Sequence, residues 1–144
     1  MKITDNIYAT SVAINNSGVL IIGKSGSGKS DLALRLINNK NAVLVSDDRT
    51  DICVKDNKLY ASAPEVIKGL MEIRGVGIVR LDYTPIVEVK LVINLVDDIK
   101  KIERMSKDKF YEKHGVKIPL IDLYAFEVSA VDKVVIKLHH NLEK

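Results

Sequence analysis

Short apolar runs separated by turn residues dominate the first half of the chain. Residues 7–14 and 42–45 are mostly apolar and predict strands, and residues 19–22 form a wholly apolar run with a glycine on each side. An uninterrupted run of this kind is typical of a strand that is buried on both faces of a sheet. Residues 51–54 and 58–62 flank a Lys-Asp-Asn turn, so we expect them to form a hairpin.

Apolar residues recur at helical spacing in two places. Residues 30–38 contain three leucines, an isoleucine and an alanine, and they predict a helix that ends at an Asn pair. Near the C-terminus, the apolar residues between Leu123 and Leu138 are spaced by three and four, which predicts one amphipathic helix. Pro64 predicts the start of a short helix through Leu70, because proline lacks an N–H that the first helical turn leaves unpaired.

The remaining segments carry weaker patterns. Residues 72–77 are punctuated by glycines and predict a loop, whereas residues 87–95 alternate and predict a strand with one polar face. Residues 100–117 hold seven Lys or Arg against three acids. They predict a solvated, charged face, which could also dock an acidic partner protein.

The order of these elements predicts the fold class. Strands that alternate with helices, in a chain of 144 residues, predict a single α/β domain over residues 1–144. The core must consist mainly of Ile, Val, Leu and Ala, because the chain has two Phe and no Trp. This composition favours a parallel or mixed sheet covered by helices. The lone cysteine, Cys53, is expected to be a small buried hydrophobic residue.

Charge and hydropathy exclude two classes of partner. The formal net charge of +3 favours the approach of anionic ligands, but the chain lacks the clustered Lys and Arg of a nucleic-acid surface. No uncharged stretch approaches the ~20 residues of a membrane span, and the N-terminus carries no apolar signal segment. We therefore expect a cytoplasmic protein that binds neither nucleic acid nor membrane.

The residues after the apolar run match the phosphate-loop pattern G-x-x-x-x-G-K-S. They are Gly23, Lys24, Ser25, Gly26, Ser27, Gly28, Lys29 and Ser30. The glycines let successive N–H groups converge on an anion, and the following helix directs its positive dipole end to the same point. In such loops the lysine, here Lys29, reaches the β- and γ-phosphates, and the hydroxyl of Ser30 ligates Mg²⁺. The sequence therefore predicts phosphoryl transfer with ATP and Mg²⁺.

Adjacent carboxylates end the next predicted strand. In an open α/β sheet, the carboxyl ends of strands gather at the crevice where a phosphate loop lies. Asp47 or Asp48 could therefore hold Mg²⁺ or take a proton from an incoming hydroxyl, and neighbours on an extended backbone point to different sides. A solvated turn in which Asp48 pairs with Arg49 is the alternative. Glu72 and Arg74 could belong to the same functional site or form an exposed ion pair.

Three segments together resemble the catalytic domain of HPr kinase/phosphorylase. They are residues 23–31, the strand end at residues 44–48, and the string Glu72-Ile73-Arg74-Gly75-Val76-Gly77-Ile78. The pattern E-I-R-G-x-G-I is that family's signature and is much more specific than a phosphate loop. The resemblance covers residues 7–138 without the family's separate N-terminal domain, so we expect a short, single-domain form. It implies a P-loop domain with a mixed sheet, a core similar to that of PEP carboxykinase, and assembly into hexamers.

The resemblance also implies roles for individual residues. Lys29 and Ser30 match the phosphate and metal contacts, and Asp47 matches the acid that accepts the proton of the target serine. Glu72 resembles the second magnesium ligand, and Arg74 lies in the same catalytic segment. By position, Asp48 is a further candidate metal ligand.

Three features depart from the family pattern or match it loosely. Arg104 is the best match to a later catalytic arginine of the family, at a shortened spacing. Tyr8 stands where the family usually has His, and a phenol with a pKa of about 10 does not replace imidazole near neutrality, although it could hydrogen-bond to Asp47. The family's P-G-R-N loop before the last helix is replaced by residues 118–123. That loop belongs to the dephosphorylating half of the activity.

The implied activity is ATP-dependent phosphorylation of a serine in HPr or a related phosphocarrier protein. The kinase direction is the stronger expectation, because the missing loop serves the reverse reaction. Two alternatives stay open. One is a nucleotide-binding regulator without turnover, for which Tyr8 and the missing loop argue, and the other is a small-molecule kinase.

Overall fold

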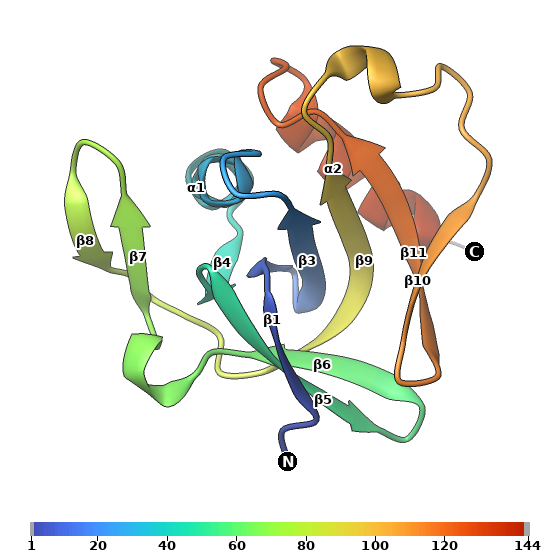
Figure 1. The fold of residues 1–144 in the computed structure, drawn as a ribbon. Coiled ribbons are helices and arrows are strands. Elements are labelled where there is room, and N and C mark those ends of the chain that lie inside the picture. The colour runs from blue at the N-terminus through green and yellow to red at the C-terminus, as the bar shows by residue number, and fades with distance from the viewer. Residues whose placement is uncertain (1, 143–144) are drawn as a thin grey trace.

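The computed structural model describes residues 2–142, which form a curled mixed sheet with two helices (Figure 1). Within these residues the main sheet has nine strands, and a separate hairpin has two. The strands of the main sheet are β1 (Asp5–Tyr8), β2 (Thr10–Ile14), β3 (Ser17–Gly23), β4 (Val43–Ser46), β5 (Arg49–Lys55), β6 (Lys58–Ser62), β9 (Val87–Leu95), β10 (Lys109–Lys113) and β11 (Val116–Leu123). The hairpin consists of β7 (Leu70–Ile73) and β8 (Gly77–Arg80), and the helices are α1 (Lys29–Lys40) and α2 (Ala130–Leu142).

The central strands bring their carboxyl ends to one edge. Strand β3 pairs in parallel with β9, which pairs in parallel with β11. Strand β2 is antiparallel to both β3 and β4, so β4 runs in the same direction as β3. The order across this part of the sheet is therefore β11-β9-β3-β2-β4. The phosphate loop after β3 and the two aspartates after β4 consequently lie at the same edge.

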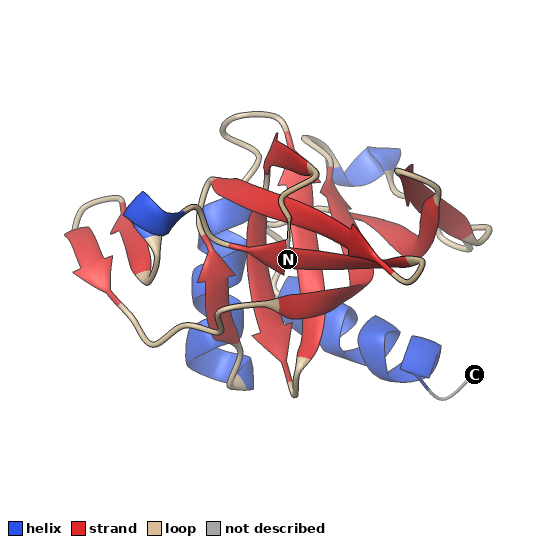
Figure 2. Cartoon of the chain, turned by 90° about the horizontal axis from the view of Figure 1, so that it is seen from below, coloured by secondary structure: helices blue, strands red, loops and turns tan. Residues whose placement is uncertain are grey.

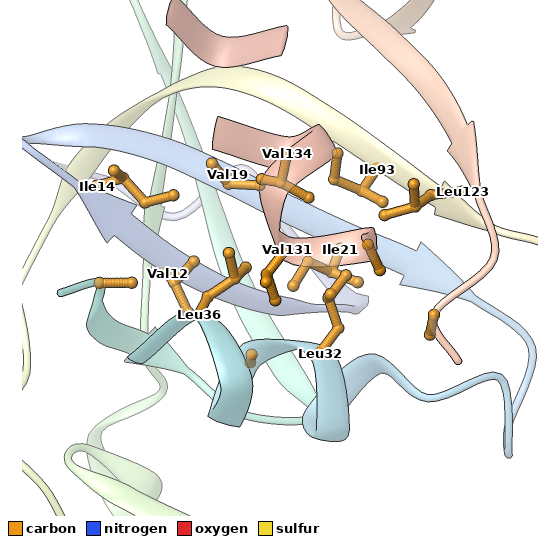
Figure 3. Close-up of a cluster of buried hydrophobic side chains, with 14 of the residues drawn as sticks. Val12, Ile14, Val19, Ile21, Leu32, Leu36, Ile93, Leu123, Val131 and Val134 are labelled. Carbon is orange, nitrogen blue, oxygen red and sulfur yellow. The ribbon is translucent and has the colours of Figure 1, made fainter. Parts of the chain in front are cut away.

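The helices cover one face of the central strands. Leu32 and Leu36 of α1 and Val134 of α2 are fully buried against Val12 and Ile21 of the sheet (Figure 3). Each such side chain contributes roughly 1.5–3 kcal/mol when it leaves water, so this layer fixes α1, and with it the phosphate loop, on the sheet.

The hairpin β5–β6 covers the opposite face, together with β1 (Figure 2). Ile52 and Leu59 of this hairpin bury against Leu20 and Val92 of the central strands. The hairpin and the burial of β3 on both faces confirm the sequence predictions. The α/β class with a mixed sheet is confirmed as well. Cys53 is buried and free, as expected.

Several predicted boundaries were wrong in the first half of the chain. Residues 7–14 form two strands rather than one, because the chain breaks at Ala9, whose N–H donates to the carbonyl of Asp48 (3.0 Å). The expected helix from Pro64 to Leu70 is only a 3₁₀ turn over Glu65–Ile67. The expected loop 72–77 is instead the end of β7 and a tight turn into β8.

The prediction for the C-terminal third was partly wrong. The charged side chains of residues 100–117 are exposed or, at Lys113, half-buried, as a solvated face predicts. The sequence did not predict the 3₁₀ turn (Ile99–Lys101), strand β10, or strand β11, in which Val116 and Ile118 are buried. Helix α2 begins at Ala130, whereas Leu123 ends β11 and Phe126 lies in the turn between them. No helix within residues 2–142 is long and apolar enough to cross a membrane.

Candidate phosphate-binding and catalytic site

The phosphate loop connects the end of β3 to the start of α1. Gly26 (φ 81°) and Gly28 (φ 99°) adopt left-handed conformations that favour glycine, and the N–H of Ser27 closes a turn on the carbonyl of Lys24 (3.0 Å). Gly28 is the N-cap of α1, and no side chain in the described part of the protein caps this helix end. The N–H groups of its first turn therefore have no side-chain acceptor among the described residues and could bind an anion.

Lys29 lies folded over this loop. Its ammonium donates to the carbonyl oxygens of Gly23 (2.8 Å) and Lys24 (3.1 Å). These two bonds hold the positive charge beside the N–H groups of the loop. Phosphate oxygens bound at the loop would thus meet the backbone donors and the Lys29 ammonium together.

A hydrogen bond joins the phosphate loop to the first aspartate. The hydroxyl of Ser30 donates to Oδ1 of Asp47 at 2.6 Å, although the two residues are far apart in the sequence. Asp47 is 7% exposed. Its Oδ1 also accepts from the hydroxyl of Thr10 (3.4 Å), and its Oδ2 accepts from the N–H of Glu72 (3.3 Å). Three elements therefore fix this carboxyl group beside the loop.

The same oxygen pair fits a magnesium ion. The Ser30 hydroxyl and the Asp47 carboxylate are hard oxygen ligands, which Mg²⁺ prefers, and in nucleotide sites one or two protein ligands suffice because phosphates and water supply the others. Among residues 2–142 no group of three or more His, Cys, Asp or Glu side chains is arranged to hold a metal. A magnesium ion at this site would therefore depend on a bound polyphosphate.

Asp48 differs from its neighbour in conformation and exposure. Its φ is +66°, and the N–H of Arg49 donates across it to the carbonyl of Asp47 (2.7 Å). The two side chains diverge as predicted, since Asp47 is buried and Asp48 exposed, but a tight turn causes this rather than strand alternation. The alternative Asp48–Arg49 ion pair does not form between these described residues, because Arg49 instead stacks on Tyr8 with its Cζ 3.6 Å from the ring centre.

The β7–β8 hairpin reaches the site through its backbone. The N–H of Glu72 donates a hydrogen bond to Asp47, while the side chains of Glu72 and Arg74 are exposed. Within the described residues these two side chains form no ion pair with each other. The hairpin that carries both charges projects from the body of the molecule beside α1 (Figures 1 and 2).

Tyr8 and Arg104 lie apart from this cluster. The Tyr8 side chain is 65% exposed. Within residues 2–142 its hydroxyl makes no hydrogen bond to Asp47, so the bond that the sequence allowed does not form. Arg104 is exposed. The segment before β10 that contains it lies on the opposite side of the molecule from the β7–β8 hairpin (Figure 1). Thr10 supports Asp47 instead, and no motif marks it. Only its pairing with Ile21, close to the loop, could have indicated this role.

The turn after β11 packs against the loop from the other side. A Cβ at Gly28 would lie 2.8 Å from Cβ of Ala125 and 2.9 Å from Cζ of Phe126, so only glycine fits there. Arg35 of α1 bonds both to the carbonyl of Ala125 and to Asp31 (3.1 Å). The bonds of Arg35 fasten this turn to α1.

Two hydrogen bonds to Asp122 hold the end of β11. Asp122 accepts from the amide of Asn94 (2.9 Å) and from the ammonium of Lys109. Partial burial raises the pKa of Asp122, but these hydrogen bonds and the positive charge of Lys109 outweigh it, and the pKa lies below its ordinary value. The ionised carboxylate therefore fastens β10 and β9 to β11.

A glycine-rich loop on a helix N-terminus, with a buried aspartate after a strand of the same sheet that runs in the same direction, defines a P-loop phosphate-binding domain. The model of the HPr serine kinase C-terminal domain family matches residues 1–141, and the chain belongs to this family.

Known relatives and a solved structure agree with this assignment. The chain is 37% identical over 125 residues to an HPr kinase/phosphorylase of Caldanaerobacter subterraneus subsp. tengcongensis, which covers 85% of this chain and 40% of the relative. It is 48% identical over 75 residues to an HPr kinase/phosphorylase of Lactobacillus johnsonii, covering 51% of this chain and 23% of the relative. The chain thus spans about two fifths or less of the length of these curated relatives.

The solved structure of the HPr(Ser) kinase/phosphatase from Coxiella burnetii superposes with a TM-score of 0.81 at 27% sequence identity. The match covers 97% of this chain and 91% of that one. The mixed-sheet fold that the family resemblance implied is therefore confirmed.

Proposed function

We propose that this protein is an ATP-dependent protein-serine kinase that acts on HPr or a related phosphocarrier protein. The observation that carries the proposal is the 2.6 Å hydrogen bond from Ser30 to the buried Asp47, which sets a carboxylate at the edge of a phosphate loop. Family membership supports the same activity, since the relatives described above are HPr kinases/phosphorylases.

In this proposal the loop binds the phosphates of ATP. The N–H groups of the first turn of α1 and the Lys29 ammonium face the β- and γ-phosphates, and they stabilise the charge that develops during transfer. Ser30 and Asp47 would hold Mg²⁺, which when bound neutralises negative charge on the phosphates. Cytoplasmic ATP is the donor that the family membership implies.

Asp47 receives the proton of the acceptor serine. The serine oxygen forms a bond to the γ-phosphorus, the bond from phosphorus to the β–γ bridging oxygen breaks, and the proton passes to the carboxylate. Oδ1 accepts hydrogen bonds from Ser30 and Thr10, whereas Oδ2 accepts one long bond from the N–H of Glu72, so Oδ2 is the better placed oxygen for this proton. A carboxylate is a weak base, so Asp47 would orient the hydroxyl and take the proton late.

The remaining candidate residues have exposed side chains. Glu72 would supply a second metal contact, and Asp48 a further one. Arg74 and Arg104 would approach the phosphates only when ligand and acceptor are bound, since neither contacts the loop in this structure. Tyr8 acts through its ring, which positions Arg49, and not as an acid or base.

Transfer of labelled γ-phosphate tests this function. Wild-type protein with Mg²⁺ and ATP is expected to label an HPr carrier and not its Ser→Ala variant. ATP binding without transfer to any carrier would favour the regulator, for which the exposed Tyr8 is the supporting observation. Labelling of a small metabolite instead would favour a small-molecule kinase.

The reverse reaction and the assembly need separate measurements. Incubation of the serine-phosphorylated carrier with inorganic phosphate tests the phosphorylase direction, which we do not expect. Size-exclusion chromatography with light scattering tests the hexamer that the family resemblance implies.

A further inference from the structure

An exposed aromatic ring lies against the phosphate loop. Phe126 is 55% exposed, yet its Cζ would lie only 2.9 Å from a Cβ at Gly28, the N-cap of α1. The chain has only two phenylalanines and no tryptophan. An apolar ring gains free energy when it leaves water, so a flat ligand group that covers Phe126 beside the loop would be bound more tightly.

The ring and the catalytic carboxylate flank the loop from opposite sides. Asp47 follows β4, which lies two strands from β3 on one side, and Phe126 follows β11, which lies two strands from β3 on the other. The ribbon views show the same arrangement, with β11 and β4 on opposite sides of β3 (Figure 1). A nucleoside triphosphate that directs its γ-phosphate to Asp47 would therefore extend its nucleoside toward Phe126.

The ring is held in a fixed orientation. Tyr124 packs edge-on against it, with ring centres 5.7 Å apart and planes at 78°. The turn that carries it is fastened by the bond from Arg35 to Ala125 and by an ion pair between Lys133 and Glu127. A base would thus meet a ring that is already ordered, so little conformational entropy is lost on stacking.

We propose that Phe126 stacks on the purine base of the bound ATP. The proposal rests on the proposed function, since it assigns the nucleoside subsite of the same phosphate loop. Every base has a π face, and removal of a stacked aromatic side chain typically weakens binding by about 5- to 100-fold. Stacking acts on the base alone, so the phosphates should be bound equally well without the ring.

Isothermal titration with ATP and with inorganic tripolyphosphate tests this assignment. Phe126→Ala and Phe126→Leu are expected to raise the Kd for ATP about tenfold or more and to leave the Kd for tripolyphosphate unchanged. The leucine variant keeps an apolar contact against Gly28 if the alanine variant is unstable. Phe110→Ala is the matched control, because Phe110 is 47% exposed on β10, where Lys117 covers it. An unchanged Kd for ATP in both Phe126 variants would overturn the proposal.

A fluorescent variant gives a second, direct readout. The chain has no tryptophan, so Phe126→Trp introduces a single one, which is expected to be quenched by ATP and not by tripolyphosphate. Phe110→Trp should respond to neither. Equal responses of the two tryptophans to ATP would overturn the stacking alone. Failure of the wild-type chain to bind either ligand would overturn the phosphate site, and with it both proposals.

Discussion

Ser30 and Asp47 are joined by a 2.6 Å hydrogen bond across 17 positions of sequence. The bond links the first turn of α1 to the residue that follows β4. In the proposed reaction the phosphates would bind beside Ser30, and the proton of the acceptor would pass to Asp47. Because Asp47 is buried, its orientation depends on this donor together with Thr10 and the N–H of Glu72.

Removal of the Ser30 hydroxyl should weaken the response to magnesium. In Ser30→Ala the buried Asp47 loses its shortest hydrogen bond and the proposed metal loses a ligand, so Mg²⁺ should bind about tenfold or more weaker. Wild-type protein should bind ATP more tightly in Mg²⁺ than in EDTA, and Ser30→Ala should show little of this difference. Ser30→Thr keeps the hydroxyl and serves as the control. An alanine variant with the wild-type response would exclude Ser30 as a metal contact.

The hydroxyl of Thr10 should matter more than that of Tyr8. Thr10→Val removes a donor to Asp47 and leaves the N–H of Asp48 without its acceptor, which costs roughly 1–3 kcal/mol of stability and lowers the transfer rate. Tyr8→Phe keeps the ring beneath Arg49 and should change the rate less than about twofold. Urea unfolding and single-turnover transfer measure both effects. A large loss of rate in Tyr8→Phe alone would restore the phenol as an acid–base group.

Gly28→Ala should destabilise the fold by more than a backbone effect alone. The residue combines φ 99° with a Cβ position 2.8 Å from Cβ of Ala125. Backbone strain and the steric clash together should therefore lower the free energy of unfolding by about 2–4 kcal/mol. The control is Gly115→Ala, where φ is 78° but the described structure leaves 4 Å of open space around a Cβ. It should lose only about 1 kcal/mol. Equal midpoints of urea unfolding for the two variants would contradict the close packing.

Asp122 should stabilise the fold only above the acid range. Its pKa in the folded state lies below the ordinary value of 3.8, so its contribution is present above pH 3.8 and is lost as the pH falls through the folded-state pKa. Asp122→Asn should therefore be less stable than wild type at pH 6, and the difference should shrink toward pH 3. Urea unfolding at both values checks this. A difference that grows toward pH 3 would mean that Lys109 and Asn94 do not stabilise the charged form.

The sequence was most informative where local patterns determine the structure. The phosphate loop, α1 and the two-sided burial of β3 follow from short-range motifs, and so does the β5–β6 hairpin. The family signature also located the segment that contacts Asp47, although the contact is made by a backbone N–H rather than by a charged side chain.

The features that the sequence did not predict depend on contacts between residues far apart in the chain. Strand β11 pairs with β9 in parallel, and the charged residues around it hide its buried Val116 and Ile118. Phe126 lies at helical spacing from Ala130, which favoured a longer helix, yet tertiary packing places it in a turn against Gly28. The contact of Thr10 with Asp47 likewise depends on the register of β2.

The most direct test of the central claim is a paired measurement on Asp47→Asn. The amide keeps an oxygen for Ser30 but cannot take a proton, so transfer to the HPr carrier should fall by a factor of about 10²–10⁴ while the Kd for ATP in EDTA stays within about threefold of wild type. Asp56→Asn, in an exposed turn, is the matched control and should transfer at the wild-type rate. Wild-type turnover in Asp47→Asn would contradict the account, because the carboxylate beside the loop would then have no part in the reaction.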